Sequence, residues 1–337
     1  MGVTSEPLVP GGVLAVDAGN SKTDVALVAA DGRVLGGARA GGFQPPVVGI
    51  GPAVAVVADA VERAAAAAGL PAAGDRGGRP LVEHTSACLA NADLPVEERQ
   101  LQEALHARGW ARDTQVANDT FAILRAGVDR PRGVAVVCGA GINCVGLLPD
   151  GRTARFPAIG KISGDWGGGS GLAEEALYLA ARAEDGRGGP TALATTLPAH
   201  FGLRTMYELI EALHLERIPH ERRYELTPVL FATADAGDAL AGSVVDRQAE
   251  EVVALATVAL RRLDLLDDEV DVVLGGGVMA AGNPRLLDGV TAGLASAAPK
   301  ARAHVVTAPP VLGAALLGLD HTGAPPSAHA TLRTYYP

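Results

Sequence analysis

The chain has few features that would mark it as a secreted or metal-cluster protein. Its 337 residues include only three cysteines, Cys88, Cys138 and Cys144, and no two of them have C-x-x-C spacing. An odd count without ligand spacing argues against a disulfide framework and against a zinc or iron–sulfur centre. We therefore expect the cysteines near residues 138–144 to be small buried side chains.

Basic segments and long apolar runs are also missing. The formal net charge is −10 and no block of Lys or Arg stands out, so nucleic acid is not an expected partner. No uninterrupted apolar run reaches about 18 residues, which excludes a predicted membrane span. The first residues lack a cationic segment followed by an apolar core, and residues 1–11 are expected to be a flexible lead-in. We expect a cytoplasmic protein without a membrane partner.

What the chain does have is apolar side chains and glycine. Apolar residues make up 48% of the sequence, glycine occupies 43 positions, and aromatic residues reach only 4%. This composition predicts substantial cores in which backbones approach one another closely. At about 100–200 residues per domain, the length predicts two domains.

The segment 12–33, GVLAVDAGNSKTDVALVAADGR, has the pattern of a β-hairpin followed by a third strand. Its first turn is long and polar, with Asp17, Gly19, Asn20, Ser21, Lys22 and Thr23. Glycine lets backbone N–H groups approach an anion, lysine adds a cation, and an Asp at a strand end can hold magnesium through water. The turn therefore predicts a phosphate and metal site, with a solvated hairpin loop as the alternative. It is not a Walker A loop, because a strand follows it.

A second segment of the same kind begins at Gly133 with GVAVVCGAGINCVGLLPDGR. The repeated strand, glycine-rich turn and strand suggest a duplicated fold with one phosphate-binding turn in each half. The second turn contains Gly139, Ala140 and Gly141, and an ordinary hairpin is the alternative. A third glycine run, Gly275, Gly276 and Gly277, follows a predicted strand. There a flat base can lie over the backbone, unless the run is only a tight β-to-α turn.

A carboxylate follows another predicted strand, over residues 114–117. Asn118 and Asp119 stand at its end, and strand ends in α/β domains face ligand crevices. A carboxylate placed there can accept the proton of an alcohol that attacks a γ-phosphate. The alternative is that Asp119 only caps the helix that starts near Phe121.

The segment 160–182, GKISGDWGGGSGLAEEALYLAAR, combines a glycine-rich loop with a predicted amphipathic helix. One interpretation is a surface helix with solvated charges. The other places Asp165 and Glu175 in a polar ligand pocket. Trp166 is expected in the core, with a stacking platform as the alternative. The histidines at 84, 200, 214 and 220 show no metal spacing with one another, residues 72–79 are expected to be exposed, and residues 321–337 to form a loose tail.

The order of these motifs resembles the N-acetylglucosamine kinase/BadF-type ATPase family of the actin, heat-shock chaperone and hexokinase superfamily. The resemblance covers residues 12–319, and the stretches 165–170 and 184–191 are similar to actinobacterial glucosamine kinases. It implies an α/β fold with two ribonuclease-H-like domains hinged around a nucleotide cleft. The N-terminal domain would comprise residues 1–118 plus 312–337, and the C-terminal domain residues 119–311.

The resemblance also implies roles for the motif residues. The turn at 17–23 would be the first phosphate motif, the turn at 139–141 the second, and residues 275–277 the adenosine motif. Asp119 would be the catalytic base, and Asn118, Gly164 and Asp165 would contact the sugar. The Cys-rich zinc motif of the ROK-type sugar kinases and the iron–sulfur cysteines of the dehydratase activators are both missing from this sequence.

These observations predict a kinase that uses ATP and Mg²⁺ to phosphorylate the 6-hydroxyl of glucosamine. The carboxylates Asp165, Glu174 and Glu175 favour a free amine over an acetamide at C2, because an amine is partly cationic near neutral pH. An N-acetylglucosamine kinase, an ATPase activator and a non-catalytic sugar sensor are the alternatives. The expected partners are an amino sugar, ATP and a second copy of the chain in a homodimer.

Overall fold

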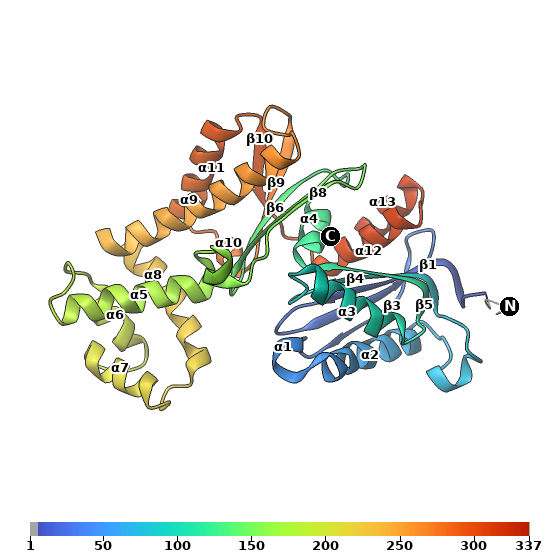
Figure 1. The fold of residues 1–337 in the computed structure, drawn as a ribbon, viewed down its shortest axis with the longest axis horizontal. Coiled ribbons are helices and arrows are strands. Elements are labelled where there is room, and N and C mark those ends of the chain that lie inside the picture. The colour runs from blue at the N-terminus through green and yellow to red at the C-terminus, as the bar shows by residue number, and fades with distance from the viewer. Residues whose placement is uncertain (1–5, 337) are drawn as a thin grey trace. The chain divides into compact units, whose positions relative to one another are not determined.

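The computed structural model describes residues 6–336, and the chain divides into two compact units (Figure 1). The first unit comprises Met1–Gly133, Val145–Thr153 and Val306–Pro337, and the second comprises Val134–Cys144 and Ala154–Val305. Residues 1–5, and with them part of the expected flexible lead-in, lie outside the described residues.

The first unit is built on a mixed sheet whose strands run in the order β3-β2-β1-β4-β5. The strands are β1 (Val9–Ala18), β2 (Thr23–Val28), β3 (Val34–Ala40), β4 (Val82–Leu89) and β5 (Ala111–Asn118). β1, β2 and β3 pair antiparallel, whereas β1, β4 and β5 pair parallel. The predicted hairpin and third strand are therefore confirmed.

Alternation along β1 and β2 divides their side chains between two cores. Leu14, Val16 and Leu27 face the core that includes α2, while Val13 and Ala15 face the core that includes α12. Because successive strand residues point to opposite faces, this run is apolar at every position and is covered on both sides. The helices of this unit are α1 (Pro45–Val48), α2 (Ile50–Ala67), α3 (Pro95–His106), α4 (Thr120–Gly127), α12 (Pro310–His321) and α13 (Pro326–Tyr335), with a 3₁₀ turn, η1 (Ala73–Asp75).

The expected loose tail is wrong, because residues 326–335 form α13. Ala328 and Leu332 of this helix, four residues apart, are buried against the core of α12. Arg333 donates hydrogen bonds to the carbonyls of Ala126 and Val128, which ties α13 to the end of α4. The 72–79 stretch is likewise not wholly exposed, because Arg76 is buried and pairs with Glu62 at 2.7 Å.

The second sheet has the order β10-β9-β6-β7-β8 and belongs mostly to the second unit, while Gly133 of β6, residues 145–147 of β7 and Thr153 of β8 are assigned to the first. Its strands are β6 (Gly133–Cys138), β7 (Ile142–Leu147), β8 (Thr153–Arg155), β9 (Val270–Gly275) and β10 (Ala301–Val305). A central strand again has two strands of a meander on one side and two later, parallel strands on the other. The predicted duplication is therefore visible in the topology of the two sheets.

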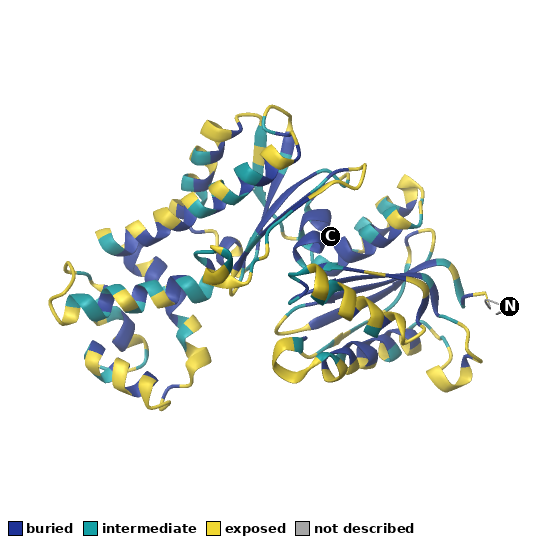
Figure 2. Ribbon diagram, viewed as in Figure 1, coloured by how far each residue is buried: buried dark blue, intermediate teal, exposed yellow. Residues whose placement is uncertain are grey.

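Helices form most of the second unit outside its sheet. They are α5 (Gly168–Glu184), α6 (Leu193–His200), α7 (Met206–His214), α8 (Leu226–Asp235), α9 (Ala239–Arg262), α10 (Gly277–Ala280) and α11 (Pro284–Ala297), with 3₁₀ turns η2 (Gly160–Ser163) and η3 (His220–Glu225). α9 packs against α11 and α8, and α5 packs against α6 and α8. Figure 2 shows that buried residues follow the strands and one side of each long helix.

The two units match the predicted α/β fold with two related domains. The first boundary was expected after residue 118, whereas α4 groups with the first unit. The reason is local packing, because α4 lies against α12 and Arg125 forms an ion pair with Asp320 at 2.7 Å. Among the residues that the structure describes, no helix has the length and apolarity needed to cross a bilayer.

Candidate functional site

In the first unit, Asp17 and Asp119 lie at the same edge of the sheet. Asp17 is next to the last residue of β1, and the parallel register pairs it with Cys88 of β4 and pairs Cys88 with Ala117 of β5. Asp119 follows β5 directly, and its backbone N–H bonds to the Leu89 carbonyl at 3.2 Å. The carboxyl ends of β1, β4 and β5 therefore bring together two carboxylates that are 102 positions apart in the chain.

Asp119 stands at the N-cap position of α4, but its side chain makes no capping hydrogen bond. The side-chain oxygen of Asn118 accepts the Thr120 N–H instead, at 3.0 Å. The half-buried Asp119 carboxylate is thus not used to start the helix. Burial raises its pKa to about 6, against the smaller opposing effect of the Thr120 N–H. A carboxylate with this pKa is ionised at neutral pH and is a stronger base than an ordinary Asp.

Asp17 is only 7% exposed, and its pKa is raised to about 7. Burial is the largest cause, followed by the negative charges of Asp119 and Asp24, and Lys22 and Arg39 only partly offset it. Both of these cations pair directly with Asp24, at 3.3 and 2.6 Å. The position therefore holds more buried negative charge than the described side chains neutralise.

This excess of negative charge is suited to binding a divalent cation. Carboxylate oxygens are the ligands that Mg²⁺ prefers, directly or through water, and a cation would favour the ionised form of Asp17. The buried hydroxyl of Thr23, opposite Ala18 in the hairpin register, has no hydrogen-bond partner. An unsatisfied buried hydroxyl costs about 1–3 kcal/mol, and a bound phosphate or metal-bound water would satisfy it.

The turn between β1 and β2 is held in place by backbone and amide contacts. The Gly19 N–H bonds to the Lys22 carbonyl at 2.8 Å, and Asn91 donates to the side-chain oxygen of Asn20 at 2.9 Å. Gln44 donates to the Asn20 carbonyl at 2.8 Å. Ser21 and Lys22 remain exposed, so the ordered turn presents a hydroxyl and an ammonium group to solvent.

Asn118, predicted to contact the sugar, uses its amide within the protein. It is buried and donates to Asp93 at 2.8 Å while its oxygen accepts the Thr120 N–H. In this structure it positions the chain around Asp119. Asp93 was not identified from the sequence, because nothing in its local spacing distinguishes it from an ordinary loop carboxylate.

In the second unit, glycines bring three predicted motifs into contact. The Gly169 N–H bonds to the Gly139 carbonyl and the Ser170 N–H to the Ala140 carbonyl, both at 2.8 Å, so α5 starts on the turn at 139–141. A Cβ atom on Gly168, whose φ is +68°, would lie 2.3 Å from the Gly141 carbonyl carbon.

Gly276 is the corresponding glycine in the run at 275–277. A Cβ atom there would lie 2.3 Å from the Cys138 carbonyl oxygen, and its φ is +86°. Only glycine fits such an approach without strain. By contrast, Cβ atoms on Gly139 and Gly141 would meet nothing within 4 Å. The turn therefore keeps open space beside its backbone, as phosphate binding requires.

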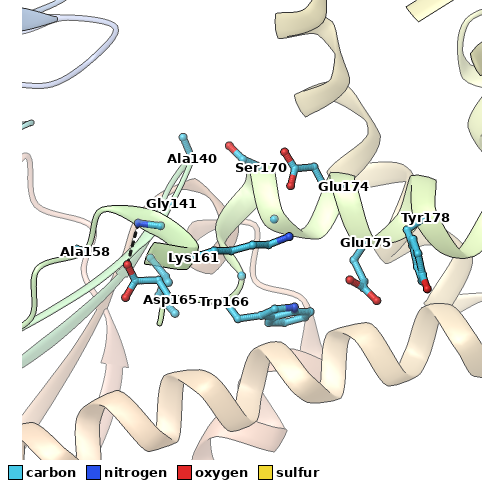
Figure 3. A pocket seen from close by; sticks show the side chains of 14 residues that line it. Ala140, Gly141, Ala158, Lys161, Asp165, Trp166, Ser170, Glu174, Glu175 and Tyr178 are labelled. Carbon is cyan, nitrogen blue, oxygen red and sulfur yellow. Dashed lines mark hydrogen bonds between the residues drawn. The ribbon is translucent and has the colours of Figure 1, made fainter. Parts of the chain in front are cut away.

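A cavity of about 580 Å³, here called cavity A, opens on one side of this turn (Figure 3). Its lining includes Lys161, Asp165, Ser170, Glu174, Glu175 and Tyr178. Glu174, Glu175 and Tyr178 all come from α5, as Figure 3 shows. The Asp165 carboxylate is held by the Gly160 N–H at 2.9 Å and by the Ser163 hydroxyl. The predicted polar pocket around Asp165 and Glu175 therefore has a physical counterpart, whereas Gly164 is absent from the lining.

Trp166 also lines cavity A, and the expectation that it belongs to the core is wrong. It is only partly buried, and the Arg247 guanidinium lies over its ring at 4.1 Å from the centroid. The Arg247 guanidinium therefore covers one face of the Trp166 ring, and Trp166 also forms part of the wall of cavity A.

A second cavity of about 650 Å³, here called cavity B, shares Ala140 and Ser170 with cavity A. Its lining combines Gly139 and Gly277 with apolar side chains such as Phe231 and Val278. Gly275 and Gly276 are not part of it. At one side Asn283 donates to both oxygens of Asp235 at 3.0 Å. An apolar slot with a carboxylate at its edge is suited to a nucleoside, whose base is flat and whose ribose offers hydroxyls.

The three cysteines are free and buried, and for Cys138 and Cys144 the burial confirms the prediction. Burial raises the pKa of each thiol well above its ordinary value. Thiols in this state are poor nucleophiles and poor metal ligands.

Two mixed five-stranded sheets of the same topology, with carboxylates at the strand ends of one unit and glycine turns beside cavities in the other, define the actin/hexokinase-like class of two-domain α/β proteins. Residues 14–318 match the BadF/BadG/BcrA/BcrD ATPase family. The chain belongs to this family.

Several named relatives are sugar kinases. An N-acetylmuramic acid/N-acetylglucosamine kinase of Clostridium acetobutylicum is 25% identical over 204 residues, 60% of this chain and 67% of the relative. An N-acetyl-D-glucosamine kinase of Dictyostelium discoideum is 24% identical over 246 residues, 70% of this chain and 75% of the relative.

Solved structures agree with the fold. A Chromobacterium violaceum protein, provisionally described as an N-acetylglucosamine kinase, aligns with a TM-score of 0.70 at 25% identity, over 93% of this chain and 100% of its own. A ROK family glucokinase of Streptomyces griseus aligns with a TM-score of 0.53 at 16% identity, over 92% of this chain and 98% of its own, and indicates the fold alone.

Proposed function

We propose that the protein is a phosphotransferase that moves the γ-phosphoryl group of ATP to a hydroxyl of an amino sugar. The observation that carries the proposal is the Asp119 carboxylate, which lies at the end of β5 without capping α4 and whose pKa is raised to about 6. The family membership of the chain and the names of its relatives support the same reaction class.

In the proposed reaction Asp119 accepts the proton of the 6-hydroxyl while that oxygen bonds to the γ-phosphorus. The bond from phosphorus to the bridging oxygen breaks, and ADP leaves with the electron pair. Asn118 and Asp93 hold the chain around Asp119 through their mutual hydrogen bond. In the first unit the turn residues Gly19 to Thr23 are proposed to contact phosphate, and Asp17 is proposed to hold Mg²⁺, which when bound offsets phosphate charge.

In the second unit the nucleotide is assigned to the turn at 139–141 and to cavity B. Open space beside Gly139 and Gly141 gives a phosphate access to backbone N–H groups. Gly277 and Phe231 would flank the base, and Asp235 would accept a hydrogen bond from the ribose. Gly276 acts indirectly, by allowing the close approach of the chain after β9 to the turn.

Cavity A is the proposed sugar site of the second unit, with Asp165 and Glu175 as hydroxyl or amine partners. The names of the relatives favour N-acetylglucosamine as the acceptor. The carboxylates on the cavity wall favour glucosamine as a second candidate, because a cationic amine gains from a nearby carboxylate and an acetamide does not.

A coupled ADP-release assay over glucosamine, N-acetylglucosamine, glucose and no sugar tests the proposal. We expect turnover that depends on an amino sugar, with the phosphorylated sugar as product. Turnover at the same rate without sugar would favour an ATPase activator, and sugar binding without ADP release would favour a sensor. Either outcome contradicts the kinase.

The Glu175→Gln variant separates the two acceptors. If the amine is recognised by this carboxylate, the ratio of kcat/KM for glucosamine to that for N-acetylglucosamine falls by about tenfold or more. An unchanged ratio removes Glu175 as the discriminating residue. The assembly is proposed to be a homodimer, which light scattering at several protein concentrations would test.

A further inference from the structure

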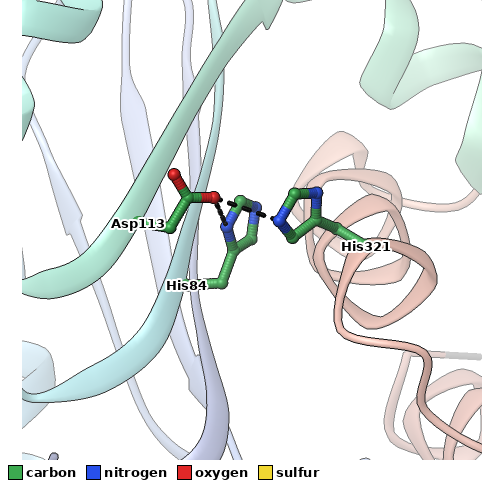
Figure 4. A group of neighbouring side chains, drawn as sticks. All are labelled: His84, Asp113 and His321. Carbon is green, nitrogen blue, oxygen red and sulfur yellow. Dashed lines mark hydrogen bonds and ion pairs between the residues drawn. The ribbon is translucent and has the colours of Figure 1, made fainter.

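Three side chains on separate elements of the first unit meet away from the residues assigned above. They are His84 on β4, Asp113 on β5 and His321, the last residue of α12 (Figure 4). The parallel register pairs His84 directly with Asp113, so their side chains lie on one face of the sheet. One carboxylate oxygen of Asp113 lies 2.9 Å from Nδ1 of His84 and 3.0 Å from Nε2 of His321.

We propose that His84, Asp113 and His321 form a binding site for one divalent transition-metal ion of the zinc type. One ligand atom from each residue lies within 4.8 Å of the other two. A tetrahedral ion with bonds of about 2.0–2.1 Å holds its ligand atoms about 3.3 Å apart. The two distances to Asp113 are close to that value, so His84 and Asp113 need little movement to reach a coordinated arrangement, whereas the His321 ring must rotate.

The chemistry of the three groups selects the metal. Two imidazoles and one carboxylate suit Zn²⁺ and its neighbours in the first transition row, whereas Mg²⁺ and Ca²⁺ prefer oxygen ligands alone. Burial lowers the pKa of His84 to about 4, which keeps its imidazole in the neutral form that binds metals. Three protein ligands leave a fourth position for water.

A second observation sets His84 apart from an ordinary core histidine. The residue is 1% exposed, and its Nε2 atom is buried with no hydrogen-bond partner. Leaving a buried polar atom unsatisfied costs about 1–3 kcal/mol. Its neighbour Thr85 also has a buried hydroxyl without a partner. Nδ1 is the His84 atom that faces Asp113, so an ion bound here would be held through Nδ1, while the unpartnered Nε2 and the Thr85 hydroxyl lie outside the ligand set.

The rings of His84 and His321 are stacked, with centroids 3.9 Å apart and planes 17° from parallel. Two rings in that position cannot both direct an in-plane lone pair at one ion. His321 has a side chain that is 46% exposed, so it can rotate out of the stack, whereas His84 is fixed within the sheet. The paired strands thus provide two placed ligands, and the end of α12 provides an adjustable third.

Metal binding here would fasten the end of α12 to β4 and β5. Asp320, next to His321, is already paired with Arg125 and with His329. The ion would therefore extend an existing set of contacts that hold α12 in the first unit. An ion that binds only the folded state stabilises it by mass action.

Binding of Zn²⁺ and Co²⁺ to chelator-treated, untagged protein tests the proposal. We expect one equivalent of Zn²⁺ by equilibrium dialysis, a visible-absorption spectrum of tetrahedral Co²⁺, and a higher melting temperature with Zn²⁺. The variants His321→Gln and Asp113→Asn should each weaken binding by about 10–100-fold and remove the Co²⁺ spectrum. Melting curves without metal establish that both variants fold.

His200→Gln is the matched control. His200 pairs with Glu225 at 2.9 Å in the second unit, a histidine–carboxylate contact that belongs to no three-ligand group among the described residues. Its metal affinity should equal that of the wild type. Asp17→Asn tests whether Zn²⁺ binds instead at the carboxylate proposed to hold Mg²⁺. If Zn²⁺ does not bind at micromolar concentration, or if binding survives in His321→Gln and is lost in Asp17→Asn, the proposed site is wrong.

Discussion

The two units share a strand order but differ in how deeply their charged side chains are buried. In the first unit Asp17, Asp24 and Arg125 are less than a tenth exposed, whereas in the described part of the second unit no Asp, Glu, Lys or Arg is buried to that extent. Both units have glycines in close backbone contact, but cavities A and B lie beside the glycine-rich turn of the second unit. One copy of the topology therefore carries buried ionisable groups, and the other carries space for ligands.

This difference has a physical origin in what each task requires. A base or a metal ligand must be held away from water, since desolvation is what shifts its pKa and strengthens its interactions. A binding surface for phosphate and a flat base needs backbone N–H groups without side chains in front of them. The same strand order serves both purposes because the groups that matter for each lie in its turns and at its strand ends.

The largest expected effect follows from removing the buried base of the first unit. Asp119→Ala should lower kcat/KM by about 10²–10⁴-fold, because general-base catalysis contributes that factor. The measurement is the coupled ADP-release assay with saturating ATP, and circular dichroism checks the fold. Near-normal turnover in a folded variant would assign the base to another residue.

The next largest expected effect is a loss of stability on breaking an ion pair, and it is compared between one pair from each unit. Asp320→Ala should lower the free energy of unfolding by about 3 kcal/mol, because it leaves the buried Arg125 guanidinium without its carboxylate. Asp246→Ala breaks the pair with Arg285 in the second unit, where both side chains are about half exposed. That control should cost about 1 kcal/mol or less. Equal losses in urea denaturation would contradict the distinction between the units.

Glycine contacts in the second unit give a third test. Gly168→Ala would place Cβ against the backbone of Gly141 at a φ of +68°, and strain of this kind costs about 1–3 kcal/mol. Because the turn at 139–141 would shift, the KM for ATP should rise as the melting temperature falls. Gly171→Ala, in the same helix with nothing within 4 Å of the added Cβ, should leave the melting temperature unchanged or slightly raised.

The smallest expected effect is a gain in stability. The pKa of Asp119 is raised from 3.8 to about 6, so the folded state binds a proton more tightly than the unfolded state does. Stability from this group is then present below pH 4 and is lost as pH rises through 6. Asp119→Asn removes that loss and should raise the free energy of unfolding by about 1–3 kcal/mol at pH 8. The gain should disappear near pH 4, and a variant that is less stable at pH 8 would contradict the assigned desolvation.

Much of the strand-end site could be predicted from the sequence because its signals are local. Asp17 follows the apolar run 13–16 and Asp119 directly follows β5, and parallel strands bring their carboxyl ends together whatever lies between them. Trp166 was misplaced because its environment depends on Arg247, 81 positions later. The burial of Leu332 was not predicted, because two apolar residues four positions apart are too few to show a helical period. Their burial depends on the core that includes α12, which the local sequence does not reveal.

The metal-ligand group could not be found from spacing at all. His84 and Asp113 are 29 positions apart and meet only through the register of β4 and β5, while His321 arrives from the other end of the chain. Pairing register is set by the whole sheet rather than by neighbouring residues.

The late position of α12 has a consequence for synthesis. Residues 310–321 cover Val13, Ala15 and Ala26, yet a ribosome makes them after the entire second unit. The nascent first sheet therefore leaves the exit tunnel with much of one apolar face uncovered, since before α12 is made that core receives Ala122 from α4. A chain stopped before residue 310 would keep that surface open to chaperones and proteases, so the first core closes only after α12 has been made.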